Sequence, residues 1–262
     1  MNSKIGRTRD VGGQLRPCGC CENTAALETQ SEVPFVRRPA SSIAEFSPLW
    51  RPVRELAVLD SIEPLLASWE KSTHPSQVRM REYRQRVREQ FGSHLTCDHL
   101  YIDLRVGLSR PQQLLNGNDL ENYLTPLFEC GCLPTQTFRL IRAEKVVGGP
   151  SRLAIGIAEP IKIVPELAAC SHLSIPTATK PTSDAEWKNS IRLALISSEI
   201  QSLPDGEAEV HIAWKCALGR RSWFRMWKPV GDAMGPILGS YERKNEFDPK
   251  DDRITKLRFY FI

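Results

Sequence analysis

The apolar positions in the first half of the chain change between helical and alternating spacing. The predicted elements there are a short helix over 53–69, a helix over 75–91, a strand over 99–108, a short helix over 120–128 and extended segments over 138–143 and 151–158. The helix over 75–91 is the best defined, because Thr73 can cap it and Pro75 suits its first turn. The strand over 99–108 has apolar residues at every second position, which is typical of one buried face.

The second half repeats this order of elements. The predicted elements are a helix over 184–203, a strand over 210–218, a short helix over 231–238 and a strand over 253–262. Tyr101 and Glu121 are 20 residues apart in the first half. Ile212 and Asp232 are also 20 residues apart in the second. We therefore expect an α/β (α+β) protein with two tandem helix–strand–helix–strand units, whose mixed sheets form an internal pseudo-dimer.

Composition divides the chain into four parts. Residues 1–45 are rich in Gly, Pro, Ser, Thr and charged residues, which predicts a disordered or loosely docked tail. Residues 46–158 form the first predicted unit, and residues 184–262 form the second. Residues 159–183 contain several prolines and many small polar residues, so we expect a connector there.

Charge and composition exclude some classes of protein and leave others open. The net charge of +4 permits contact with an anionic polymer without requiring it. The sequence has no long apolar run and no apolar signal core near its start, so we expect a cytoplasmic protein without a membrane partner. Its cysteines should then be thiols. The close groups Cys18, Cys20 and Cys21, and Cys130 and Cys132, match zinc sites poorly, since those favour a two-residue spacer.

Two groups of acidic residues are candidate metal ligands. Asp119 and Glu121 lie at the start of the helix over 120–128, and Asp251 and Asp252 lie just before the last strand. Taken singly, each group is equally typical of a helix N-terminus or a turn. If the groups converge, their carboxylates repel one another unless a cation binds. Such oxygen ligands suit Mg²⁺ or Mn²⁺.

These acidic motifs resemble those of the RusA-type Holliday-junction resolvases of bacteria and their prophages. Members of that family are small dimeric α/β proteins with K-P-D-x-D-N at a helix start and D-D later, before a strand. Residues 119–122, Asp-Leu-Glu-Asn, resemble the D-L-D-N core with Glu as the second acid. Residues 228–233, Lys-Pro-Val-Gly-Asp-Ala, resemble a K-P-x-x-D stretch, and residues 251–254 resemble the later D-D-x-I.

The resemblance covers roughly residues 75–158 and 184–262, and neither half has a complete motif. No D-D pair precedes Ser151 in the first half. The second half has Val230 and Ala233 where the motif has Asp and Asn. These departures leave two interpretations: one composite site across both units, or a chain that has lost catalysis and kept binding.

The resemblance implies a Mg²⁺- or Mn²⁺-dependent endonuclease that hydrolyses phosphodiesters in branched DNA. The implied metal ligands are Asp119, Glu121, Asp251 and Asp252, with Asp232 as a residual ligand. Lys228 would steady the scissile phosphate, and Asn122 would hydrogen-bond a ligand carboxylate. The residues expected to contact DNA phosphates are Arg79, Arg81, Arg84, Arg88, Arg220 and Arg221. Trp223 and Trp227 would stack on unpaired bases.

Other interpretations of the same residues stay open. The arginines of the helix over 75–91 are also typical of a solvated helix face, and tryptophans beside a strand are often core residues. The main alternative function is a catalytically inactive module that binds branched or single-stranded DNA or a protein. A protein-only interaction domain is a third class. A fused pair of units is compatible with a monomeric pseudo-dimer or with a homodimer.

Overall fold

The structure is a computed structural model, and it describes part of the chain. The described residues are 49–68, 70–115, 119–128, 132–161, 184–198, 200–214, 224–241 and 247–261. All of them belong to the second of two compact units, Pro34–Ile262. Outside the described residues lie the predicted tail over 1–45, most of the connector over 159–183, Cys18, Cys20, Cys21 and Cys130, and Arg220, Arg221 and Trp223. No helix among the described residues is long and apolar enough to cross a bilayer.

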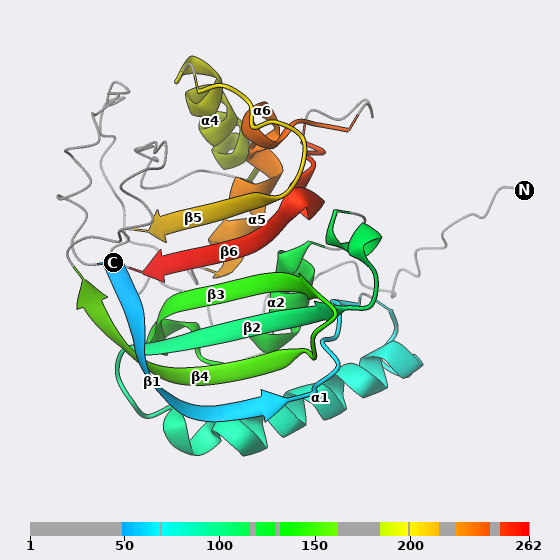
Figure 1. Ribbon diagram of the computed structural model, residues 1–262, viewed down its shortest axis with the longest axis vertical. Helices are drawn as coiled ribbons and strands as arrows, with labels where there is room; N and C mark the ends of the chain where they lie inside the picture. The colour runs from blue at the N-terminus through cyan, green and yellow to red at the C-terminus, as the bar shows by residue number, and fades with distance from the viewer. Residues whose placement is uncertain are drawn as a thin grey trace, which may run out of the picture. The chain divides into compact units, whose positions relative to one another are not determined.

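A mixed β-sheet runs through both halves of the described chain (Figure 1). Its strands are β1 (Leu49–Asp60), β2 (Leu100–Leu108), β3 (Phe138–Val147), β4 (Arg152–Ile161), β5 (Ala208–Trp214) and β6 (Ile254–Phe261). The spatial order is β1-β4-β2-β3-β6-β5. Strand β2 is parallel to β3, and β5 is parallel to β6. The two parallel pairs join through antiparallel pairing of β3 with β6, so the halves share one sheet.

Helices cover one face of this sheet. They are α1 (Pro75–Phe91), α2 (Leu120–Phe128), α4 (Asp184–Ser197), α5 (Phe224–Ala233) and α6 (Gly235–Leu238). The main core includes Phe91 of α1, Leu124 of α2 and Trp227 of α5, packed with alternate residues of the strands. On the other face, Arg142 pairs with Asp103 at 3.4 Å and other charged side chains form similar cross-strand pairs. This division explains the alternating pattern of β2, whose even-numbered residues are buried.

The α/β class and most predicted elements are confirmed. The helix over 75–91 and the short helix over 120–128 have the predicted bounds, and the predicted strands agree within a few residues. The cap of α1 differs from the prediction by one position. His74 is the N-cap, and its ring accepts a hydrogen bond from the main-chain N–H of Ser76, with Pro75 in the first turn as expected.

Two predicted helices are wrong in kind or in position. The segment predicted as a helix over 53–69 begins with the second part of β1, which pairs with β4 through two register shifts. Those bulges break the strict alternation that would have identified a strand, and long-range pairing decides the structure. The helix predicted over 231–238 is in fact α5 followed by α6. Asp232 therefore lies in the last turn of α5, whereas Glu121 lies in the first turn of α2.

Candidate functional site

The strand topology places the acidic residues of the two predicted groups at the same edge of the sheet. Strands β2 and β3 are parallel, so the segment after β2 and the last residues of β3 lie at the same edge. Strand β6 is antiparallel to β3, so β6 begins there. The acids at the start of α2 therefore meet the acids that precede β6. The central expectation of a shared acidic site was that these two groups converge, and in the structure they do.

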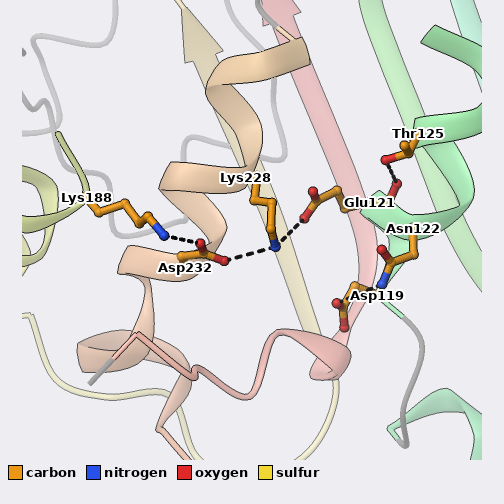
Figure 2. Close-up of polar contacts among 7 residues, drawn as sticks. All are labelled: Asp119, Glu121, Asn122, Thr125, Lys188, Lys228 and Asp232. Carbon is orange, nitrogen blue, oxygen red and sulfur yellow. Dashed lines mark hydrogen bonds and ion pairs between the residues drawn. The ribbon is translucent and has the colours of Figure 1, made fainter. Parts of the chain in front are cut away.

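The first acidic group is fixed by the start of α2. The main-chain N–H of Asn122 donates to the carbonyl of Asp119 at 3.0 Å. The Asn122 side chain donates to the Asp119 carboxylate at 3.2 Å, as Figure 2 shows. Glu121 is only 8% exposed, and its carbonyl accepts a hydrogen bond from the Thr125 hydroxyl. Asn122 thus orients a candidate ligand carboxylate, which is the role expected for it.

The second acidic group lies in a short 3₁₀ turn, Asp251–Arg253, directly before β6. Asp252 is 5% exposed, and its carboxylate accepts a hydrogen bond from the Tyr241 hydroxyl. The main-chain carbonyl of Asp252 accepts from Nζ of Lys145 at 2.6 Å. The buried Arg253 guanidinium donates to the carbonyls of Leu238 at 2.6 Å and Gly206 at 2.8 Å. The turn is therefore fixed by hydrogen bonds to Lys145 of β3, to Leu238 of α6 and to Gly206.

The crowded carboxyl groups have raised pKa values. Burial, followed by the nearby Asp119 carboxyl, raises the pKa of Asp251 to about 8. Burial raises the pKa of Glu121 to about 7, against the opposing charge of Lys228 and with a further increase from Asp232 and Asp119. Burial also raises the pKa of Asp119. A side-chain hydrogen bond between Asp251 and Asp119 opposes part of the rise in the Asp119 pKa.

A chain of alternating charges leads from this cluster to α4. Nζ of Lys228 lies 4.0 Å from the Glu121 carboxylate and 3.3 Å from the Asp232 carboxylate. Lys188 of α4 donates to the other oxygen of Asp232 at 2.7 Å, so Asp232 lies between two lysines (Figure 2). Burial alone would lower the pKa of Lys228, but Glu121 and Asp232 outweigh it and the pKa is raised. In this arrangement Asp232 orients Lys228, and its two ion pairs compete with any role as a metal ligand.

Trp227 is a second neighbour of Glu121 on α5. Its side chain is buried and packs edge-on against Phe259, so the core interpretation holds for this residue. The indole N–H opposes part of the rise in the Glu121 pKa. It falls short of a geometrically complete hydrogen bond to any group in the described part of the chain.

The arginines expected to contact DNA lie on α1 in different environments. Arg79, Arg81 and Arg88 have exposed side chains. Arg81 also donates to the carbonyl of Ser72 at 2.7 Å. Arg84 is partly buried and donates to the carbonyl of Pro126 at 2.9 Å, which ties α1 to the end of α2. Arg84 thus has a packing role whether or not it contacts phosphate.

Sequence reasoning missed three polar residues that contact the predicted site. They are Lys145, Tyr241 and Lys188. Lys145 is 4% exposed on the helix-facing side of β3, where apolar residues are the rule. Burial lowers its pKa, although Asp119, Asp252 and Asp251 oppose that change. The sequence signal for Lys145 is that a lysine falls on the buried side of a strand. This signal can be recognised only when the extent of β3 and the side of the strand that is buried are known.

The donor set suits a hard divalent cation. Asp119, Glu121 and Asp251 provide carboxylate oxygens, which Mg²⁺ and Mn²⁺ prefer. Burial is the largest cause of the raised pKa values of Glu121 and Asp251, and neighbouring carboxyl groups raise them further against the charge of Lys228. Within the described ranges, no three His, Cys, Asp or Glu side chains are arranged closely enough to hold a metal ion without rearrangement.

Comparisons with protein family models, with curated proteins and with solved structures found no match to this chain.

Proposed function

We propose that the protein is a metal-dependent endonuclease that acts on branched DNA, in the manner of the Holliday-junction resolvases that its acidic motifs resemble. The observation that supports this proposal most strongly is that Asp119 and Glu121, from one half, share a partly buried cluster with Asp251 from the other. Converging carboxylates with raised pKa values are typical of functional sites in general and of divalent-cation sites in particular.

Each residue of the cluster has an assigned role in this proposal. Asp119, Glu121 and Asp251 would hold Mg²⁺ or Mn²⁺, and Asp252 would contribute once its hydrogen bond from Tyr241 is exchanged. A bound cation of this kind supplies an activated water and stabilises the leaving oxygen of a phosphodiester. Lys228 has an exposed side chain beside Glu121, from which its ammonium can reach a phosphate oxygen. Asn122 holds the Asp119 carboxylate in one orientation.

The proposal includes an origin of the site in two fused, diverged units. Each half contains a run of helix, strand, helix and strand that ends in β3 or β6, and the two strands of each run are parallel. The first half has two additional strands, β1 and β4, which pair antiparallel. The two parallel pairs meet at the antiparallel contact of β3 with β6, where a two-fold axis would relate them. Such an axis makes α2 and α5 antiparallel, which explains why the start of α2 meets the end of α5. A monomer would then contain the equivalent of a dimer, and its DNA substrate would place it in the cytoplasm.

The test is cleavage of a synthetic four-way junction, with linear duplex of the same sequence as the comparison substrate. Mg²⁺ or Mn²⁺ should support cleavage of the junction alone, and EDTA should abolish it. Asp119→Asn should remove cleavage, whereas Asp98→Asn, at an exposed position after α1, should leave it unchanged. Junction-independent cutting, or cleavage by the Asp119→Asn variant at the wild-type rate, would overturn the proposal.

A second candidate is a module on the same fold that binds branched or single-stranded nucleic acid without cleaving it. The ion pairs of Lys228 and Lys188 with Asp232 favour this candidate, because lysines there already neutralise part of the acidic cluster. It predicts junction binding that is equally tight in EDTA and in Mg²⁺. It also predicts that Asp119→Asn does not weaken binding.

A further inference from the structure

A buried lysine joins the two acidic segments of the site. Lys145 lies on β3 in line with Ile141 and Ala143, on the face that packs against the helices. A lysine at such a position loses its hydration, and it is tolerated only when its ammonium has good partners. The partners of Lys145 therefore indicate what it does.

Those partners are main-chain carbonyls from two distant parts of the chain. Nζ of Lys145 donates to the carbonyl of Leu114 at 3.1 Å and to the carbonyl of Asp252 at 2.6 Å. Leu114 ends the 3₁₀ turn Pro111–Leu114, which precedes Asp119. Asp252 lies in the other acidic segment. One ammonium group thus links the approach to α2 with the turn before β6.

Two other residues hold the acidic segments in place, but each contacts only one of them. Arg253 ties the turn before β6 to Gly206 and Leu238. Asn122 orients Asp119 from within α2 itself. Neither of these residues contacts both the turn before β6 and the approach to Asp119, whereas Lys145 donates to Asp252 in the first and to Leu114 in the second.

We propose that Lys145 is a positioning residue that clamps together the segments carrying Asp119 and Asp251, so that only a small rearrangement is needed for their carboxylates to share one divalent cation. The cation belongs to the proposed function, and the inference rests on that function to this extent. The clamp itself is a property of the protein without metal. Hydrogen-bonding groups behind metal ligands fix their orientation, and their loss typically weakens metal binding about 10- to 100-fold.

The first arm of the test measures the clamp in EDTA, independently of any metal. Lys145→Met keeps an unbranched side chain of similar size and removes the donors. Hydrogen–deuterium exchange should become faster in peptides covering both 119–124 and 248–253. The control is Lys256→Met, because Lys256 is exposed on the opposite face of the sheet. If the Met variant does not fold, Lys145→Gln, which keeps polar donors, takes its place. Unchanged exchange in either segment would overturn the clamp.

The second arm measures Mn²⁺ affinity from the electron paramagnetic resonance signal of free Mn²⁺. Lys145→Met should bind Mn²⁺ at least tenfold more weakly than wild type, and Lys256→Met should bind it equally. Lys145→Arg, which restores charge and donors, should recover most of the affinity. Equal affinity of the wild type and Lys145→Met would overturn the positioning role while leaving the nuclease proposal intact. A wild-type protein that does not bind Mn²⁺ would defeat the proposed function, and the exchange arm would still decide the clamp.

Discussion

Replacing Asp251 by Asn should change how the stability of the metal-free protein depends on pH. The folded state raises the pKa of Asp251 from 3.8 to about 8, because the carboxyl is buried beside Asp119. Between these pH values the folded state therefore holds a proton that the unfolded state has released. The free energy of unfolding of the wild type must fall as pH rises through this window. Glu121 acts in the same direction up to about pH 7.

The magnitude follows from the same pKa values. A tenfold change in proton affinity corresponds to about 1.4 kcal/mol, so the full change for Asp251, from pKa 3.8 to about 8, corresponds to about 6 kcal/mol. Because the Asp119 and Asp251 carboxyl groups titrate as a coupled pair, only part of this free energy is removed when Asp251 alone is replaced. We expect that Asp251→Asn, which cannot ionise, gains about 2–4 kcal/mol of stability relative to wild type between pH 4.5 and pH 8.5.

The assay is urea denaturation in EDTA at a series of pH values, followed by fluorescence of the tryptophans. Asp98→Asn is the matched control, since Asp98 is exposed and should follow the wild type at every pH. At pH 8, added Mg²⁺ should stabilise the wild type and have less effect on Asp251→Asn, because a ligand has been removed. A difference between wild type and Asp251→Asn that is independent of pH would refute the electrostatic reasoning.

Three further changes test the packing and the DNA contacts. Arg253→Met removes buried donors from main-chain carbonyls and should lower the free energy of unfolding by about 3 kcal/mol in urea; a loss below about 1 kcal/mol would contradict this. Gly156→Ala places a Cβ atom 2.1 Å from the carbonyl oxygen of Arg54, so thermal unfolding should show a loss of about 2 kcal/mol or more, and an unchanged midpoint would be inconsistent with the β1–β4 register. Changing both Arg79 and Arg88 to Gln should weaken junction binding and reduce its salt dependence by about two counter-ions in a fluorescence titration, whereas an unaltered slope would show that α1 does not contact phosphate.

The sequence predicted the elements whose patterns are local. Strand β2 follows from its alternating apolar residues, and α1 follows from its spacing and from Pro75. Strand β1 was missed, because its alternation is interrupted where it bulges against β4. The order of the strands, and the sharing of one sheet by both halves, depend on long-range pairing that no local pattern contains.

The residues of the candidate site likewise include some that the sequence predicted and some that it did not. The convergence of Asp119 and Asp251 was expected from their places at the ends of elements, and the structure brings them together. Asp232 was taken as the counterpart of Glu121 from equal spacing, but it lies at the opposite end of its helix and pairs with Lys188. Lys145 was missed because its role depends on the register of β3 against its neighbours.

The most direct test of the shared cation site is to locate Mn²⁺ by anomalous X-ray diffraction from crystals of the full chain grown with the ion near pH 7.5. We expect an anomalous peak between the carboxylates of Asp119 and Asp251, within coordination distance of both, and no such peak in crystals of Asp119→Asn. Mn²⁺ bound only at other positions, or no bound Mn²⁺ at millimolar concentration, would contradict it.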